Sequence, residues 1–290
     1  KLLASGYAPE SEEYSKYKKT LLEIMWSNKA VSETYEPGST YKIGVALAAL
    51  ENNEINTSTI CTCEKVYKPL GEKAPTCLEH HGDMNIFEAI QESCNIFFYT
   101  LGHRMGVEAI TDYTLRLGLG TSTGIELGEI IGTIADPEVK KKLEPKEENQ
   151  EWLVVDDVHA AIGQSYHQYT PLQLNVYMSS IVNGGTRYSA HLLDSVRSFY
   201  SNEIIESYNT TALDNIEFSS STLDVLLESM RRVVYNNDEI KWRFANVPVT
   251  VGGKTGTAQA VGTNNALFVA FAPYDDPEIA ISVVVEHGEH

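Results

Sequence analysis

The feature of this sequence that most restricts its fold is a change of pattern near the C-terminus. Residues 247–258, 266–272 and 279–286 are rich in β-branched side chains and are separated by Gly, Pro and Asp, as short strands are. The last two runs flank the turn sequence Pro-Tyr-Asp-Asp-Pro at residues 273–277, so we expect them to pair as an antiparallel hairpin. Helices in the middle of the chain and strands at its end together indicate an α/β fold.

The residues before these strands have helical spacing. In residues 39–52, apolar side chains recur at i, i+3, i+4 and i+7 from Ile43 onward, which is one face of a helix. The sequence predicts an antiparallel sheet flanked by helices, with a mainly helical subdomain at about residues 52–165 and a sheet subdomain from the remainder. The other segments with a clear prediction are helices at 86–92, 95–105, 172–182 and 222–234 and loops at 56–84 and 136–151.

Composition and charge exclude several classes of protein. A chain of 290 residues with 42% hydrophobic and 21% charged residues is neither disordered nor fibrous. Its 40 acidic and 22 basic residues give a net charge of −18, which repels phosphate backbones, so we expect no nucleic-acid partner. No apolar run approaches the roughly 20 residues that a membrane-spanning helix needs.

Ser39 and Lys42 lie three residues apart at the start of the first predicted helix, after a Pro-Gly turn. This spacing puts a hydroxyl and an amine on the same helix face. A serine becomes nucleophilic when a base lies within hydrogen-bond reach, and a lysine can serve if burial or a nearby cation lowers its pKa. By itself the pattern is weak, since a second Ser-x-x-Lys occurs at residues 15–18 without an apolar stripe.

Two further short motifs carry polar side chains. Lys254-Thr255-Gly256-Thr257 follows two glycines on a predicted strand, where the backbone can approach a substrate, its amides can stabilise an oxyanion and the lysine can bind a carboxylate. Ser93-Cys94-Asn95 lies between two predicted helices and can direct its Ser and Asn into one cleft. Taken singly, an edge strand with a protective lysine and a pair of helix caps are the simpler explanations.

The order of the three motifs decides between these interpretations. Ser-x-x-Lys, then Ser-x-Asn about fifty residues later, then Lys-Thr-Gly on a late strand is the motif set of serine penicillin-recognising enzymes. Residues 35–42, Tyr-Glu-Pro-Gly-Ser-Thr-Tyr-Lys, resemble the active-site segment of class B penicillin-binding proteins, the monofunctional D,D-transpeptidases. The resemblance covers nearly the whole chain and is closest to the Gram-positive, sporulation-type enzymes. It extends to Ala160–Gln164, Thr170–Gln173, Asn183–Gly185 and Gly253–Gln259.

The resemblance implies the fold shared by these transpeptidases and the serine β-lactamases, and a reaction. Ser39 would attack the D-Ala-D-Ala carbonyl of a peptidoglycan stem peptide to form an acyl-enzyme, and Lys42 would accept its proton. Ser93 would relay a proton to the departing D-Ala, and Asn95 would hydrogen-bond the donor peptide. An amine from a neighbouring stem would then resolve the acyl-enzyme and cross-link the wall.

The strand motif would bind the other end of the substrate. The resemblance implies that Lys254 keeps the site positive, that Thr255 and Thr257 bind the terminal carboxylate beside Gly256, and that the amides of Ser39 and Thr257 form the oxyanion hole. β-Lactams would acylate the serine as mimics of D-Ala-D-Ala, and catalysis would need no cofactor. A serine β-lactamase and a non-catalytic β-lactam sensor of the same fold are the alternatives.

The resemblance also implies a location and partners. The domain would work at the outer face of the cytoplasmic membrane, held by an anchor and pedestal outside this chain, with a glycosyltransferase as a partner. Leu3–Gly6 looks like the end of the family's second strand, and His290 follows soon after the last strand. We therefore expect the family's first strand and closing helix to lie outside this chain.

A group of potential metal ligands interrupts the first predicted loop. Three thiolates and an imidazole form a known tetrahedral zinc set, and a metal can order a stretch that is short of hydrophobic residues. The sequence therefore indicates a structural zinc. Its candidate ligands are Cys61, Cys63, Cys77, His80 and His81, with Asp83 as a further candidate for the fourth position.

Other states of these cysteines are equally compatible with the sequence. A disulfide between Cys61 and Cys77 would suit a protein outside the cytoplasm and would leave Cys63 free, and four free thiols are the third alternative. Cys94 lies inside the Ser-x-Asn motif. We expect it to be a small buried residue that could also reach the same metal.

Overall fold

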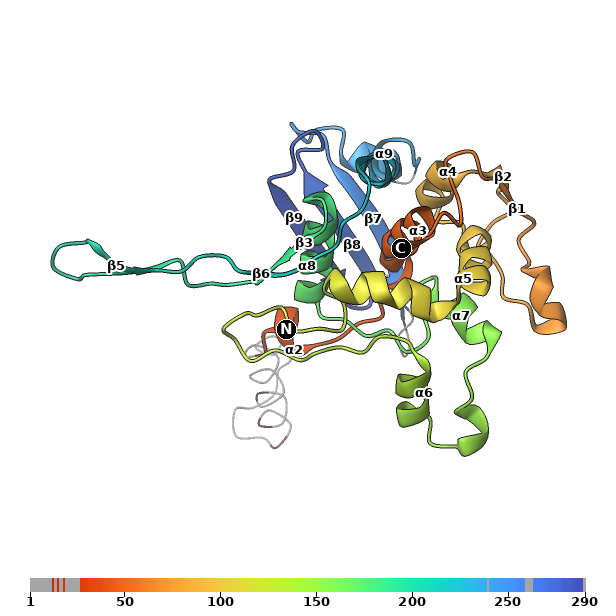
Figure 1. Cartoon of the computed structure of the whole chain (residues 1–290), viewed down its shortest axis with the longest axis horizontal. Coiled ribbons are helices and arrows are strands. Elements are labelled where there is room, and N and C mark those ends of the chain that lie inside the picture. The colour runs from red at the N-terminus through yellow and green to blue at the C-terminus, as the bar shows by residue number, and fades with distance from the viewer. Residues whose placement is uncertain are drawn as a thin grey trace.

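The C-terminal strands form an antiparallel sheet in the order β7-β8-β9. The structure is a computed structural model that describes residues 12, 15, 18, 27–238, 240–258 and 263–288. The strands are β7 (Gly252–Ala258), β8 (Asn265–Ala272) and β9 (Ile279–Val285), and they lie near the middle of the molecule (Figure 1). The predicted hairpin between the last two strands is confirmed. The expectation for Leu3–Gly6 falls outside the described residues.

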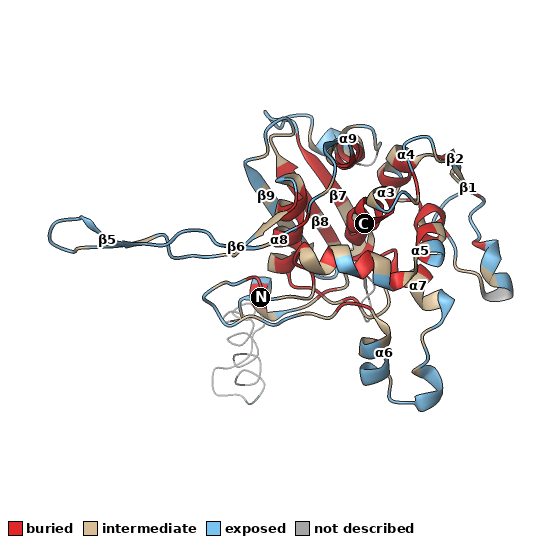
Figure 2. Cartoon of the chain, viewed as in Figure 1, coloured by how far each residue is buried: buried red, intermediate tan, exposed pale blue. Residues whose placement is uncertain are grey.

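Two amphipathic helices pack against this sheet. α8 (Pro171–Val182) lies against β8 and β9, and α9 (Ser220–Tyr235) lies against β7. Each begins at a hydroxyl cap, because the side chains of Thr170 and Ser219 accept hydrogen bonds from the first-turn amides. The core is continuous from the sheet through these helices into the rest of the body (Figure 2). The predicted α/β class, an antiparallel sheet flanked by helices, is therefore confirmed.

The helix that follows the first motif is buried on all sides. A short 3₁₀ turn, η2 (Gly38–Tyr41), carries Ser39 and leads directly into α3 (Lys42–Glu51). The first eight residues of α3 are buried, including its only charged side chain in that stretch, Lys42. Helices that are apolar all round belong in the core, and α3 packs there against α5 (Asn95–Arg116) and α9.

Both segments predicted as loops contain regular structure. Residues 56–84 include a small hairpin of β1 (Cys61–Cys63) and β2 (Gly82–Met84) with the 3₁₀ turn η3 (Lys68–Lys73) between them. Residues 136–151 include α6 (Pro137–Leu143) and η4 (Glu147–Asn149).

A cap and a buried ion pair explain the helix in the charged run. Asp136 caps α6 through Val139 N–H, and Pro137 occupies the first helical position. Lys140 is only 8% exposed and pairs with Asp156 at 2.7 Å. The loop prediction for 136–151 was wrong because local charge density does not show which side chains find buried partners.

A long hairpin projects from the body where the sequence indicated no strands (Figure 1). Its base is the ladder of β3 (Thr186–Tyr188) with β6 (Ala212–Asn215), and farther out β4 (Ser195–Arg197) pairs with β5 (Ile204–Ser207). We call residues 190–211 the arm. The remaining short elements are α2 (Lys29–Ser32), α4 (Ile86–Gln91), α7 (Val154–Ala160) and η5 (Lys241–Arg243). Among the described residues, no helix is long and apolar enough to cross a membrane.

Three backbone segments meet at glycines beside Ser39. Gly38 N–H donates to Gly163 O at 3.0 Å, and a Cβ added at Gly163 would lie 2.1 Å from Gly38 O. On the other side, a Cβ at Gly38 would lie 2.4 Å from Thr257 O. Both glycines have positive φ, +51° and +76°, which other residues rarely adopt. Only glycine therefore lets η2 sit this close to β7.

We predict that Gly163→Ala destabilises the domain by more than about 2 kcal/mol, since the left-handed backbone costs about 1–2 kcal/mol and the clash adds to it. Thermal unfolding should show a fall in Tm of about 5 °C or more. Gly71→Ala is the matched control, because Gly71 has a similar φ of +74° with no atom within 4 Å of an added Cβ. Equal losses in both variants would contradict the close packing at Gly163.

Candidate active site

A cavity of about 530 Å³ opens where η2, β7 and the start of α5 meet. The 3₁₀ turn supplies Ser39, the N-terminal end of α5 supplies Asn95 with Ser93 just before it, and β7 supplies its hydroxyl-bearing strand. The structure thus brings the three sequence motifs together around one hollow. The motif residues that line it are Ser39, Ser93, Asn95, Thr255, Gly256 and Thr257.

Two fully buried lysines converge on Ser93 behind this wall. Lys42 Nζ donates to Ser93 O at 2.7 Å, to Ser93 Oγ at 3.2 Å and to Asn95 Oδ1 at 2.6 Å. Lys254 Nζ donates to the same Ser93 Oγ at 3.0 Å and to Thr255 O at 3.1 Å. A hydroxyl oxygen has two lone pairs, so Ser93 bridges the two amines. Its φ of +55° is unusual for serine and marks a backbone that its surroundings hold in place.

Burial of these amines changes their acidity. Burial lowers the pKa of Lys42 from 10.5 to about 7, although the nearby thiols of Cys77 and Cys94 act in the opposite direction. Burial also lowers the pKa of Lys254 well below its usual value, and the charge of Lys42 lowers it further while Glu92 raises it. A low dielectric disfavours the ammonium form. Near pH 7 a neutral amine therefore becomes available in this cluster, which is what a general base requires.

Ser39 is half-buried and faces the cavity at the front of the helix that begins with Lys42. The Lys42 backbone N–H donates to Ser39 O, which closes the 3₁₀ turn. Among the described residues, no hydrogen-bond partner is found for the Ser39 hydroxyl, so it is available to a bound molecule. In free enzymes, catalytic hydrogen bonds are often formed only when the substrate binds.

Most of the other cavity residues belong to none of the three motifs. The lining includes the acidic residues Glu79, Glu92 and Asp238, which come from three separate segments of the chain. Ile162 and Gln164 come from the segment around Gly163 that resembles the class B family, and His81 is one of the candidate metal ligands, so these three carry a sequence signal. The others lie here because of tertiary folding, and the remaining lining residues are Leu78, Gln91, Asn236, Asn237 and Asn264.

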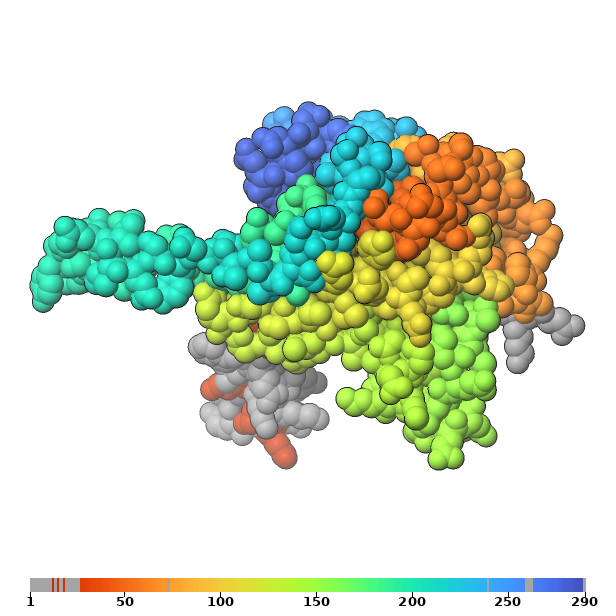
Figure 3. Space-filling model, in the orientation of Figure 1, coloured from red at the N-terminus to blue at the C-terminus, as the bar shows by residue number. Residues whose placement is uncertain are grey.

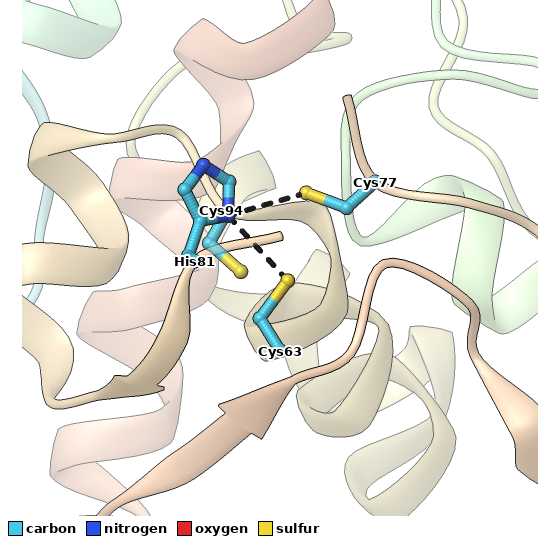
Figure 4. Close-up of side chains that lie close together, drawn as sticks. All are labelled: Cys63, Cys77, His81 and Cys94. Atoms are coloured by element: carbon cyan, nitrogen blue, oxygen red, sulfur yellow. Dashed lines mark hydrogen bonds between the residues drawn. The ribbon is translucent and has the colours of Figure 1, made fainter. Parts of the chain in front are cut away.

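A compact group of possible metal ligands lies next to the cavity (Figure 4). Ligand atoms of Cys63, Cys77, His81 and Cys94 all lie within 4.8 Å of one another. The sulfurs of Cys63 and Cys77 are 3.4 and 3.6 Å from His81 Nδ1. The four thiols of the chain are all free, so the structure does not contain the disulfide considered between Cys61 and Cys77.

The structure selects different ligands from those that spacing alone suggested. Cys61 shares a face of β1 with Cys63, but residues two apart on a strand are separated by about 6.6 Å, and its sulfur lies 3.6 Å from Thr100 Oγ1 instead. His80 is exposed and outside the group, and the Asp83 carboxylate accepts a hydrogen bond from Thr62. Cys94, expected mainly as a small buried residue, completes the set.

This donor set fits zinc. Three sulfurs and one imidazole nitrogen are typical of structural zinc sites, and ligands at about 2.3 Å from one metal lie about 3.8 Å apart. A hydrogen bond from the Cys94 thiol lowers the pKa of Cys77 to about 4, so one thiolate is already favoured. Asn95 N–H also donates to Cys77 Sγ at 3.2 Å. The group therefore lies directly behind the Ser-x-Asn motif.

The fold and the site together define a serine penicillin-recognising domain. Comparison with known families agrees: residues 1–290 match the penicillin-binding protein transpeptidase domain. The chain belongs to this family, and the class B resemblance read from its motifs is confirmed.

Three relatives illustrate the similarity. Peptidoglycan D,D-transpeptidase MrdA of Haemophilus influenzae is 27% identical over 308 residues, covering 96% of this chain and 45% of the relative. Stage V sporulation protein D of Bacillus subtilis is 32% identical over 271 residues, covering 90% of this chain and 38% of the relative. A solved complex of PBP2 and MreC from Helicobacter pylori aligns with a TM-score of 0.78 at 29% identity, covering 96% of this chain and 51% of that one. This chain thus spans less than half of the two curated relatives.

We predict that Lys42 loses its proton at about pH 7, more than three pH units below an ordinary lysine. NMR of ¹³C-labelled lysine side chains should show one resonance with this midpoint, and Lys42→Arg should remove it because arginine stays charged. A midpoint above 9 would show that the amine is solvated and would contradict the burial described above.

Proposed function

We propose that this domain is a peptidoglycan D,D-transpeptidase, a serine acyltransferase that cross-links stem peptides ending in D-Ala-D-Ala. The observation that carries the proposal is that Ser39, Ser93 and Asn95 line one cavity. Buried Lys42 hydrogen-bonds Ser93 and Asn95 behind it, and buried Lys254 hydrogen-bonds Ser93. Membership of the penicillin-binding protein transpeptidase family supports the same reaction, since MrdA is named a peptidoglycan D,D-transpeptidase.

In the proposed acylation, Ser39 Oγ attacks the carbonyl carbon between the two D-Ala residues. Neutral Lys42 accepts the hydroxyl proton, and the lowered pKa of this amine supports that role near pH 7. Ser93, bonded to both amines, passes a proton to the nitrogen of the departing D-Ala as the C–N bond breaks. The products are free D-Ala and a serine ester, which the amine of a second stem peptide converts to a new amide.

The strand β7 would hold the donor peptide. The Thr255 and Thr257 hydroxyls bind its terminal carboxylate beside Gly256. Lys254, whose pKa burial lowers well below its usual value, would supply positive charge in its protonated form. The amides of Ser39 and Thr257 would bind the oxyanion, and the close packing of Gly38 on Thr257 supports this because it brings the two segments together. Asn95 would bind the peptide amide on the opposite side of the cavity.

β-Lactams would acylate the same serine, and the rate at which the ester breaks down separates the candidate functions. A β-lactamase of this fold releases it quickly, and a sensor keeps it without transferring it to an amine. Rapid turnover of a chromogenic cephalosporin would favour the β-lactamase. Transfer from a thioester substrate to D-amino acids would exclude a pure sensor, and we expect this result.

We predict a single covalent penicillin adduct on the wild-type domain, on Ser39, and none on Ser39→Ala. Intact-protein mass spectrometry measures this directly. Ser207→Ala is the matched control, because this serine belongs to a second Ser-x-Asn sequence on the exposed arm. Ser93→Ala should still form the adduct but at least about tenfold more slowly, as expected for loss of a proton relay. An adduct on Ser39→Ala would overturn the assignment of the nucleophile.

We also propose that a structural zinc is held by Cys63, Cys77, His81 and Cys94. The close approach of three sulfurs and one imidazole nitrogen supports it. Bound there, zinc would supply no chemistry to the acylation and would join the β1–β2 segment to the start of α5. Both carry residues that line the cavity or lie next to it.

We predict about one zinc per chain by elemental analysis, and its loss in Cys77→Ser. A site bound at 100 times its Kd contributes about 2.7 kcal/mol, so Tm should fall by about 5–10 °C in this variant or after chelation. Cys61→Ser is the control and should retain zinc, because its sulfur lies outside the ligand group. The zinc site would be overturned by wild-type protein that contains no zinc and has the same Tm before and after chelation.

The remaining proposals concern the subdomains, the cellular role and the location of the domain. The helices α4 to α7 lie within residues 52–165 and support the division into a helical and a sheet subdomain. The 32% identity to Stage V sporulation protein D supports a role in sporulation. The similarity to MrdA, whose name contains no reference to sporulation, supports a role outside sporulation. A membrane anchor and pedestal outside this chain, a site at the outer face of the cytoplasmic membrane and a glycosyltransferase partner would accompany either role.

A further inference from the structure

The arm is an ordered hairpin attached firmly at its base. Ala190 N–H donates to Thr123 O at 2.8 Å, and the Glu126 carboxylate accepts from the amides of Leu192 and Leu193 at 2.9 and 3.2 Å. Near the tip, Ser198 N–H donates to the carbonyl at position 203 at 2.8 Å. The space-filling view shows the arm extending well clear of the body (Figure 3). These hydrogen bonds therefore fix the direction in which the arm projects.

Most of the arm is exposed (Figure 2), and several of its exposed side chains are large and apolar. Phe199 and Tyr200 at the tip are 94% and 96% exposed, and their rings meet edge to face with centroids 5.5 Å apart. Leu192 and Ile205 are 67% and 69% exposed. All four residues of β5 are exposed, so the alternation that buries one face of an ordinary strand is missing here.

Such a ribbon is poorly stabilised by itself. A two-stranded hairpin is marginal in water unless further strands or a packing surface cover it, and contiguous exposed apolar surface marks interaction sites. Buried aromatic side chains contribute about 150–250 Å² each. The two tip rings could therefore supply about half of the roughly 800 Å² that each partner buries in a standard interface.

The charge of the arm distinguishes between its potential partners. Residues 190–211 contain Asp194, Glu203 and Glu206, one arginine, Arg197, and no lysine. A second copy of this chain would bring the same acidic arm and a total net charge of −18. An anionic membrane surface attracts basic segments, which the arm lacks. The complementary partner is a protein with an apolar pocket and a basic rim.

We propose that the arm is a docking element that inserts Phe199 and Tyr200 into an apolar pocket of a partner protein, with the arm's carboxylates facing lysine or arginine side chains at the rim. No residue of 190–211 lines the catalytic cavity. A partner on the arm would therefore position this domain without obstructing the cavity, and the proposal does not depend on the proposed transpeptidase reaction.

The test uses the full-length protein in its own cells with a photoactivatable phenylalanine at position 199. Leu143 is the matched control position, since it is exposed and apolar but lies at the end of α6. We expect a cross-linked protein from position 199 that position 143 does not give, with the cross-linked peptide carrying both apolar and basic residues. The Phe199 ring is almost fully exposed and its ring contact is with Tyr200 on the same tip, so the replacement does not disturb the core.

Charge reversal then tests the rim. Glu203→Lys with Glu206→Lys should lower the cross-linking yield about fivefold, as loss of about 1 kcal/mol from two surface pairs would. Asp275→Lys with Asp276→Lys, on the exposed turn before β9, should leave the yield unchanged. Unchanged β-lactam labelling shows that each variant is folded, and thermal unfolding gives an independent check.

Several results would overturn the proposal. These are no adduct above the level of position 143, an adduct made only of peptides from this chain, cross-linking to lipid, or a yield that charge reversal on the arm does not change. Absence of an adduct would exclude a partner at the tip. Adducts with this chain alone or with lipid would assign the arm to a second copy or to the membrane. A yield that charge reversal does not change would contradict the argument from charge.

Discussion

The site depends on the burial of two lysines against one serine. Lys42 and Lys254 come from a helix and a strand that are far apart in sequence, and both donate to Ser93 Oγ. If the two amines were exposed to water, both would stay protonated at neutral pH. The low dielectric around α3 and β7 lowers the pKa of each, so catalysis of the proposed kind follows from how tightly these elements pack.

That packing is maintained by backbone contacts rather than by large side chains. Gly38, Gly163 and the carbonyl of Thr257 lie so close that a single methyl group would separate them. The glycines keep the turn that carries Ser39 against β7. The group of possible metal ligands supports the Ser-x-Asn motif. It includes Cys94, which lies between Ser93 and Asn95 in the sequence, and Cys77, whose sulfur accepts a hydrogen bond from Asn95 N–H. Backbone contacts at glycines thus support the turn that carries Ser39, and the group of possible metal ligands supports the Ser-x-Asn motif.

Local sequence patterns were sufficient to predict a helix or strand where its buried face follows a regular apolar pattern. The helix at α8 begins at a Thr-Pro cap, and the last two strands are apolar runs on either side of a turn, so that helix and the β8–β9 hairpin could be predicted. The pairing of β7 with β8 was not predicted. The same reasoning failed for α6, whose charges conceal a cap and a buried Lys140–Asp156 pair. It also missed the arm, because β4 and β5 expose nearly every side chain and therefore show no buried face.

The sequence by itself determined the chemistry available to this protein, since the residue types and order of its three motifs specify a serine, its lysines and the strand beside them. Only the tertiary structure decided which cysteines meet, that His81 rather than His80 joins them, and that acidic residues from three separate segments line the cavity. The physical reason is distance. Motifs record neighbours along the chain, whereas pKa shifts and ligand sets depend on atoms a few ångströms apart that folding brings from remote segments.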